Sequence, residues 1–226
     1  QGMNPLQQFS DFNVNANTTP YYYKIYPINT CGDVKMISNF GKTMRLTVTS
    51  DSIAINNTLS WNNYDGWQGY VKEYEIYRSV GGVWQTAPVA TVFPQTGMIT
   101  YKDNISTITR GNGEFCYKVV AKENPILHVG NLTAAASTSN SDCVNQSPLL
   151  YVPNAFDPLS AYNPTFKPIL TFSDPTAYSF MVFDRWGQKV FETNELNKGW
   201  NGQMNNSGSM SPSGTYVYVV RFKSAT

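Results

Sequence analysis

The residue types that most often carry out chemistry are scarce and scattered in this sequence. His128 is the single histidine, and it stands in a loop with no Gly-x-Ser-x-Gly motif or comparable nucleophile setting. Glu73 and Glu75 share one face of a predicted strand, but that face is expected to be exposed to solvent. A pair of glycosidase carboxylates remains an alternative, although no two acidic residues are singled out. We therefore expect His128 to be an exposed loop residue and the protein not to be an enzyme.

The three cysteines lack the close spacing that metal and redox sites need. Cys31, Cys116 and Cys143 form no C-x-x-C pair, so neither a thiolate zinc site nor a thioredoxin-type motif is supported. We expect no metal and no cofactor. The odd number leaves one cysteine without a partner among these three.

Aromatic side chains are the best candidates for a small-molecule site. Trp67 and Tyr70 follow the Asp65-Gly66 turn, and Trp84 is a further candidate for an aromatic platform that binds surface glycans. The alternative is that these loop aromatics pack over the edge of a β-sandwich.

The composition narrows the class of protein. Of the 226 residues, 14% are charged and the net charge is +1, so there is no basic field for a nucleic acid. The chain has 15 Tyr, 12 Phe and 5 Trp, which favours strands over helices. It contains no run of 18 apolar residues for a membrane-spanning helix. Its first residues lack the features of an export signal, which we expect to lie upstream.

Residues 42–147 alternate apolar and polar side chains in about seven short strands, with turn signals every few residues. The strongest strands are residues 72–78 (KEYEIYR) and 114–121 (EFCYKVVA), and Gly81-Gly82 predicts a hairpin leading to residues 83–84. Residues 133–144 are predicted to form the last strand. With Trp61 in the second strand and Tyr117 in the tyrosine-corner position, this region resembles a fibronectin type III domain. The resemblance implies an immunoglobulin-like β-sandwich.

An internal repeat extends this pattern toward the N-terminus. Tyr23-Lys24-Ile25 matches Tyr117-Lys118-Val119, and Ser38-Asn39 matches Ser139-Asn140. Residues 21–27 are predicted to form a strand, followed by a weaker one at residues 34–38. Residues 1–41 are therefore predicted to be the C-terminal strands of a truncated domain of the same type.

The resemblance also pairs two cysteines. Cys116 and Cys143 lie on strands that are neighbours in a fibronectin-like sheet, so a cross-strand disulfide is expected, with two unpaired thiols as the alternative. A disulfide implies a periplasmic or extracellular location. Cys31 has no matching position in the repeat.

The C-terminal region is organised around a predicted hairpin at residues 178–191 (YSFMVFDRWGQKVF). Tyr178, Phe180 and Val182 alternate with Met181 and Phe183, as in a half-buried strand, and Gly187 permits the chain reversal. Further motifs accompany this hairpin in the order VPNAF (152–156), TFKP (165–168), GWNG (199–202) and GTYVY (214–218).

These motifs resemble the gliding motility-associated C-terminal domain, the type B sorting domain of the type IX secretion system. The resemblance covers residues 148–226 and implies a small β-sandwich that directs large surface proteins through the outer-membrane translocon. It also implies a PorP/SprF-like outer-membrane β-barrel as a partner. One segment departs from the family: the usual acidic glycine-rich loop is replaced by residues 157–164 (DPLSAYNP). Asp157 alone cannot supply the six to eight oxygen ligands of Ca²⁺, so no metal is expected there.

The motif residues have two interpretations. Phe180, Val182, Phe191, Trp200, Tyr216 and Tyr218 are expected in the core of the C-terminal domain. Arg185 and Trp186 stand at a turn, where they either cap the sandwich and bond to turn carbonyls or contact the secretion machinery. The candidate sorting residues are Pro153, Asn154, Phe156, Arg185, Trp186, Gly187, Trp200, Tyr216 and Tyr218.

Together these patterns predict an all-β chain of tandem immunoglobulin/fibronectin III-like sandwiches ending in a small β-sandwich sorting domain. The expected function is secretion targeting and cell-surface presentation of a large gliding adhesin of the Bacteroidota. The alternatives are a carbohydrate-binding module and an accessory region of a secreted hydrolase.

Overall fold

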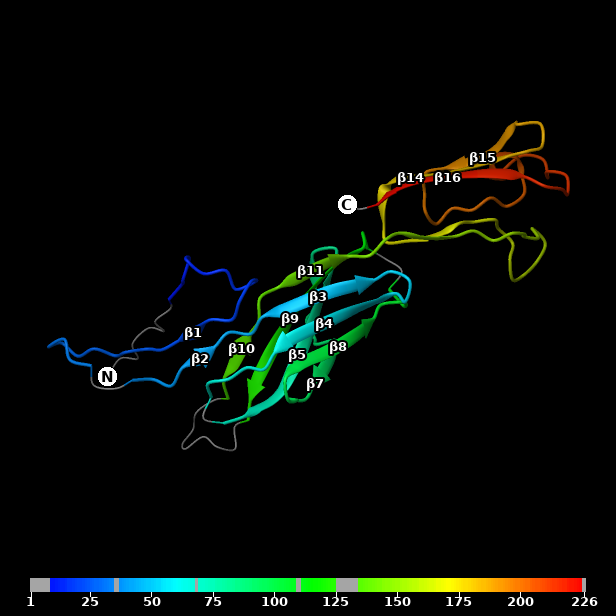
Figure 1. Ribbon diagram of the computed structural model, residues 1–226. Coiled ribbons are helices and arrows are strands. Elements are labelled where there is room, and N and C mark those ends of the chain that lie inside the picture. Colours follow the sequence, from blue (N-terminus) through cyan, green and yellow to red (C-terminus); the bar gives the residue numbers. More distant parts are fainter. Residues whose placement is uncertain (1–8, 35–36, 68, 109–110, 125–133, 225–226) are drawn as a thin grey trace, which may run out of the picture.

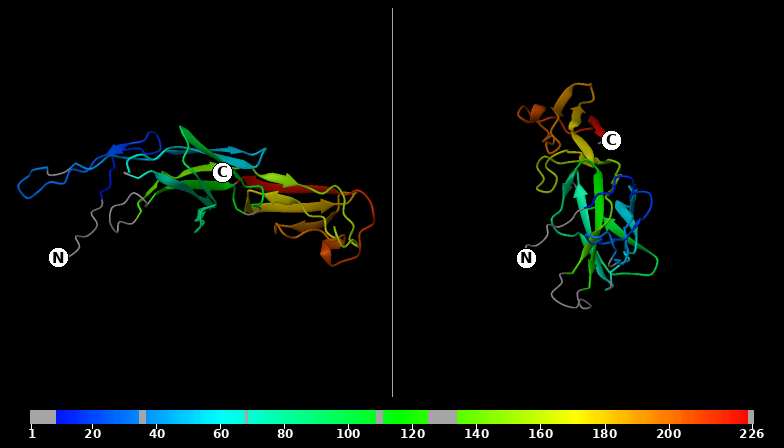
Figure 2. Two further views of the ribbon diagram at one scale, coloured as in Figure 1. Left: turned by 90° about the horizontal axis from the view of Figure 1, so that it is seen from below. Right: turned by 90° about the vertical axis from the view of Figure 1, so that its left-hand side faces the viewer.

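The computed structural model describes residues 9–34, 37–67, 69–108, 111–124 and 134–224. Its regular structure is almost entirely β, as the sequence predicts, and one 3-10 turn is the exception. The elements follow one another along an elongated molecule, with the N-terminal segment at one end and the C-terminal strands at the other (Figures 1 and 2).

The middle of the chain is a sandwich of two antiparallel sheets. One sheet has the order β3-β4-β8, and the other has the order β10-β9-β5-β6, with β7 paired to β5 and β11 paired to β9. The bounds are β3 (Leu46–Asp51), β4 (Asn56–Asn62), β5 (Val71–Val80), β6 (Val83–Trp84), β7 (Ala90–Val92), β8 (Met98–Asn104), β9 (Glu114–Glu123), β10 (Ala136–Thr138) and β11 (Asp142–Asn145).

The core between these sheets is built from the alternating side chains that the sequence predicts. Leu59 and Trp61 of β4 meet Tyr74 and Ile76 of β5, and all four side chains are fully buried. The rings of Trp61 and Tyr74 pack edge to face, with 5.8 Å between their centroids. The inward residues of β9 are buried to the same degree, namely Phe115, Tyr117, Val119 and Ala121.

The predicted last strand at residues 133–144 is wrong as a single element. Its described part is split into β10 and β11, which pair with different parts of β9. The break follows from Asn140, whose side chain crosses to the other sheet and bonds both the N–H (2.7 Å) and the C=O (3.0 Å) of Leu46. β11 also bonds to β3, since the N–H of Val48 donates to the carboxylate of Asp142 (2.7 Å).

The N-terminal segment contains β1 (Tyr22–Tyr23), which pairs with β2 (Gly41–Lys42). The predicted strand at residues 21–27 is therefore shorter than expected. The segment joins the sandwich through backbone bonds such as Lys42 N–H to Asp65 C=O (2.9 Å).

The internal repeat is visible in the hydrogen bonds. The N–H of Ile25 donates to the hydroxyl of Ser38 (2.8 Å), and the N–H of Val119 donates to that of Ser139 (2.9 Å). Each serine N–H returns a bond to the carbonyl of the same partner, at 3.0 and 2.9 Å. The two segments thus share one local hydrogen-bonding pattern, and the assignment of residues 1–41 to a truncated domain of the same type stays a prediction.

The C-terminal region places a three-stranded sheet, of order β15-β14-β16, opposite a short β12-β13 pair. An antiparallel bridge between Phe166 and Trp200 extends the second layer. The bounds are β12 (Leu149–Tyr151), β13 (Ile169–Thr171), β14 (Ser173–Phe183), β15 (Lys189–Thr193), the 3-10 turn η2 (Met204–Asn206) and β16 (Val217–Ser224).

One residue of the C-terminal region lies in the core of the sandwich before it. Phe172 joins β13 to β14 and is 3% exposed, and its ring packs on Phe115 of β9. Gly113 makes this approach possible, because a Cβ there would lie 2.8 Å from the carbonyl oxygen of Gln146 and 3.2 Å from the Cβ of Phe172. The junction is therefore a packed contact between the two units.

Candidate functional site

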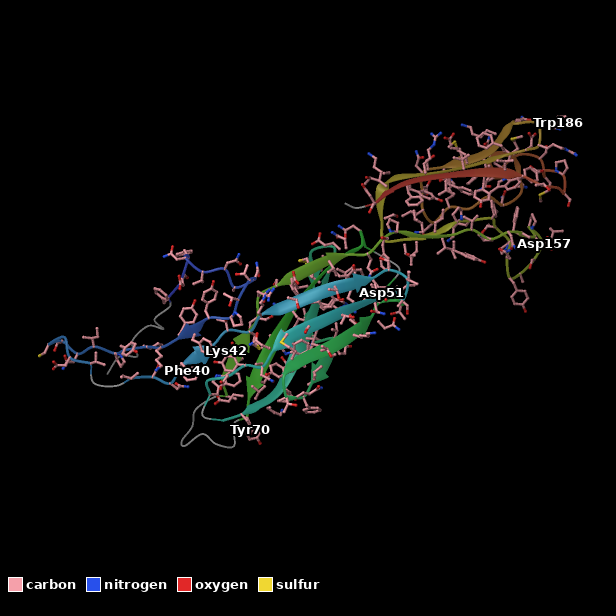
Figure 3. All side chains as sticks on the ribbon, in the orientation of Figure 1. Phe40, Lys42, Asp51, Tyr70, Asp157 and Trp186 are labelled. Atoms are coloured by element: carbon pink, nitrogen blue, oxygen red, sulfur yellow. A yellow bond between two sulfur atoms is a disulfide. The ribbon has the colours of Figure 1, made fainter. Side chains whose placement is uncertain are left out.

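A sharp turn presents Trp186 at the far end of the C-terminal domain (Figure 3), and Arg185 precedes it in the same turn. The turn is held by Asp184, whose carboxylate accepts the N–H groups of Trp186 and Gln188, both at 2.9 Å. The N–H of Gly187 donates to the carbonyl of Asp184 (3.1 Å), and Gly187 adopts φ of 82°, as the motif predicts. The turn is therefore fixed by its own hydrogen bonds and needs no packing of the tryptophan.

Trp186 is 83% exposed, so the interpretation that it caps the sandwich is wrong. Arg185 lies over its ring, with the guanidinium carbon 5.7 Å from the centroid. The carbonyls of the turn are bonded by backbone N–H groups instead of by Arg185. The exposure of Trp186 and the hydrogen bonds within the turn indicate that neither side chain is needed to hold the fold together. Both are therefore available to contact a partner.

A groove of about 600 Å³ lies in the same domain between two loops. Its floor is aromatic: Phe156 lies 5.4 Å from Trp200 and 5.8 Å from Phe166, and Trp200 lies 4.7 Å from Tyr216, centroid to centroid. Asn154 is exposed at the groove. The structure thus brings together four of the predicted residues, Asn154, Phe156, Trp200 and Tyr216.

Trp200 itself is 1% exposed, as the core interpretation predicts. Its indole N–H donates to the carbonyl of Gln203 (2.8 Å). The flanking glycines are required by close contacts, since a Cβ at Gly199 would lie 2.9 Å from the Cβ of Lys167, and Gly202 adopts φ of 87°. The GWNG motif is therefore a structural element that supports the groove.

The side chains of the remaining candidate sorting residues are more exposed to solvent than core side chains are. Pro153 is half-buried, Tyr216 is half-buried, and Tyr218 is 44% exposed although its ring lies 5.5 Å from that of Phe166. The interpretation of Tyr218 as a buried core residue is wrong. The strand before the turn does match its prediction, since Tyr178, Phe180 and Val182 are buried.

The hydroxyl of Tyr178 is buried and has no hydrogen-bond partner among the described residues. Burial disfavours the charged phenolate and raises the pKa of Tyr178 to about 12. Alternation along the strand predicts that this side chain faces inward, but it does not predict whether the hydroxyl finds a partner.

The predicted disulfide joins Cys116 to Cys143 across paired positions of β9 and β11, with 4.0 Å between the Cα atoms. Cys31 is exposed and free. Among the described residues, the one cluster of side chains with metal-ligand atoms is Glu114 with these two bonded cysteines. The carboxylate of Asp157 instead accepts the N–H of Leu159 (2.9 Å).

The proposed sugar platform is only partly assembled. Trp67 and Tyr70 line an open pocket between β4 and the start of β5. Trp84 lies on β6 and is not part of that pocket. The ring of Trp67 packs on Tyr64, with 4.2 Å between centroids, and both cover the core. His128 lies outside the described residues.

Glu73 and Glu75 are half-buried, so the predicted full exposure of their face is wrong, and each of them forms an ion pair. Glu73 accepts from Lys72 (3.1 Å) and Glu75 pairs with Lys122 (3.2 Å). Within the described residues there is no helix with the length and apolar character needed to span a bilayer.

The groove and the tryptophan turn both lie within the region that matches a known family. Residues 150–226 match the family model of the CHU_C type IX secretion signal domain, two residues inside the predicted boundary at 148. No curated protein matches the chain. The match supports a type IX secretion signal in residues 150–226, and such a signal implies export across the outer membrane toward the cell surface or the extracellular space.

Proposed function

We propose that this chain is the C-terminal secretion-targeting and surface-presentation region of a gliding adhesin of the SprB type from the Bacteroidota. The preceding sandwich serves as a fibronectin III-like spacer, and the C-terminal domain carries the sorting information. The partners are the type IX translocon and a PorP/SprF-like outer-membrane β-barrel. No step of the proposal requires catalysis, a metal or a cofactor.

The observation that carries this proposal is the exposed Arg185–Trp186 pair on a self-supported turn of the signal domain. Trp186 is 83% exposed, whereas the aromatic side chains of the groove floor and of the GWNG motif pack against one another within the domain. A residue that is costly to expose and contributes little to the fold is available for a partner.

The test replaces Trp186 with alanine in a secreted cargo that ends in residues 1–226, expressed in a cell with a working type IX system. We expect the folding stability to stay within about 0.5 kcal/mol of the unmodified chain, since the side chain is exposed. We expect surface display to fall while cargo accumulates in the periplasm. Tyr162→Ala is the matched control, because Tyr162 is an exposed aromatic (99%) of the same domain.

A deletion provides the converse test. Removing residues 148–226 should leave the cargo in the periplasm, but it also removes Phe172 from the core of the sandwich. A second deletion that starts at residue 174 keeps Phe172 and separates loss of sorting from loss of stability. Normal surface display of both truncated cargoes would contradict the proposal.

A carbohydrate-binding role for residues 42–147 is the second candidate, and it rests on the pocket formed by Trp67 and Tyr70. A glycan array probed with the whole chain and with Tyr70→Ala, whose side chain is 60% exposed, tests it. Binding that Tyr70→Ala abolishes supports this role, and absence of binding removes it. The sequence upstream of Gln1 separates an adhesin from the accessory region of a secreted hydrolase.

A further inference from the structure

The last strand of the C-terminal domain has one open side. β16 pairs with β14 along one edge, and within the described residues no other strand pairs with it. β15 is the other outer strand of this sheet, but η2 lies against it. The two edges of the sheet are therefore not equivalent.

Burial falls steeply toward this open side. Val182 of β14 is fully buried, and its partner Phe191 on β15 is 2% exposed. Its partner on the other side, Tyr218 of β16, is 44% exposed although it points toward the same core. Val220 and Phe222, the next two inward residues of β16, pack on the core but stay half-exposed. The core of this sandwich is thus uncovered along one strand.

The opposite layer, β12 with β13, also exposes apolar side chains. Leu150 and Tyr151 of β12 are 41% and 62% exposed, and Ile169 of β13 is 51% exposed. Partly exposed apolar side chains beside an unpaired strand edge indicate that the edge of β16 has room for one more strand.

The free edge has little protection against strand addition. Residues 217–220 (VYVV) are apolar, β-favouring and free of proline, and their ladder with β14 is regular from Ser179 to Phe183. The charged residues of β16 are Arg221 and Lys223, which both lie in its second half. Arg221 makes no ion pair within the described part of the chain.

We propose that the free edge of β16, from Val217 to Arg221, is a strand-addition site for an extended segment of an outer-membrane component of the secretion machinery. The segment carries apolar side chains toward Tyr218 and Val220, where they close the core, and an acidic residue beside Arg221. Backbone bonds along the edge supply affinity, and these side chains supply specificity. This inference rests on the proposed function, because it names how the sorting domain is held.

The first experiment locates contacts in secreting cells. A photo-crosslinking amino acid replaces Val217 or Val219 in the whole chain fused to an exported cargo, with Val83 as the control. Val83 is exposed (73%) on β6, a short outer strand of the other domain. We expect an adduct with an outer-membrane secretion component from 217 and 219 but not from 83. An adduct between two copies of the chain, or no adduct, overturns the proposal.

The second experiment weakens the edge without unfolding the domain. Val217→Lys introduces a charge at an apolar position of the edge, and Arg221→Glu reverses the charge that the acidic residue of the partner would contact. Val83→Lys is the matched control. We expect surface display to fall about tenfold for each edge variant, which corresponds to about 1.4 kcal/mol of binding free energy. The thermal midpoint of each purified variant should stay unchanged, and the 217 adduct should be lost in Arg221→Glu.

The outcomes separate the two proposals. If deleting the C-terminal domain does not impair display, the proposed function fails. If that deletion blocks display while both edge variants are displayed normally, sorting stands and strand addition at β16 is wrong.

Discussion

Phe172 of the C-terminal region packs edge to face on Phe115 in the core of the preceding sandwich, with 5.5 Å between ring centroids. The backbone of Phe172 has φ of 57°, which residues other than glycine seldom adopt. A large buried ring at this junction contributes more than the unfavourable backbone costs. The sandwich is therefore completed by a residue that lies beyond its own strands in the sequence.

Replacing Phe172 with alanine should destabilise the sandwich by about 3 to 5 kcal/mol, the usual range for a buried phenylalanine. Urea unfolding of the whole chain measures the change. Phe93→Ala is the control, because Phe93 is 67% exposed and its loss should be nearly neutral. Equal stability of the Phe172 variant and the unmodified chain would show that the interdomain contact is energetically unimportant.

Replacing Tyr117 with phenylalanine should lower the stability by about 1 to 3 kcal/mol. Its hydroxyl accepts from Asn57 (2.8 Å) and donates to Asp103 (2.8 Å), which also pairs with Arg78 (2.7 Å). Removal of the hydroxyl leaves a buried amide donor and a buried carboxylate each short of one partner. Denaturant unfolding measures the loss, and unchanged stability would contradict the assigned network.

The same substitution at Tyr178 should have the opposite or no effect. The Tyr178 hydroxyl is buried and has no partner in the described part of the chain. Tyr178→Phe therefore removes a desolvated polar group and should leave stability unchanged or raise it by about 1 kcal/mol. The pair of variants is internally controlled, since both remove one hydroxyl from a buried tyrosine. A loss of more than about 1 kcal/mol at 178 would mean that the hydroxyl has a partner in solution.

Alternation along the sequence predicts which side chains face the cores, but several long-range contacts have no local signal. Tyr74, Ile76, Phe180 and Val182 lie where a period of two places them. The break between β10 and β11 depends on the bond from Asn140 to Leu46, residues that are far apart in the chain. The exposure of Trp186 could not be predicted, because the alternating pattern ends before the turn. Tyr218 also lies where the period of two places it, and its exposure follows from the position of β16 as an outer strand of the described sheet.

Alkaline pH should destabilise the C-terminal domain through Tyr178. Burial raises its pKa to about 12, whereas an unfolded tyrosine titrates near 10. Tyr178 therefore stays protonated to a higher pH in the native state than in the unfolded state. Its contribution to the free energy of unfolding is complete below about pH 10 and is lost as the pH rises to about 12. Unfolding free energies measured across this interval should fall more steeply for the unmodified chain than for Tyr178→Phe. Parallel curves would contradict the burial of a neutral phenol at this position.

Reduction of the Cys116–Cys143 disulfide should destabilise the sandwich by about 3 to 4 kcal/mol. The bond closes a loop with a sequence separation of 27, and opening it returns that loop entropy to the unfolded chain. Paired serines at 116 and 143 should lower the thermal midpoint, whereas Cys31→Ser should not, because Cys31 is exposed and free. Reductant should lower the thermal midpoint of Cys31→Ser as much as that of the unmodified chain. It should leave the thermal midpoint of the double variant Cys116→Ser/Cys143→Ser unchanged. If reductant shifts no midpoint, the bond contributes no stability, and β9 and β11 are held by their ladder alone.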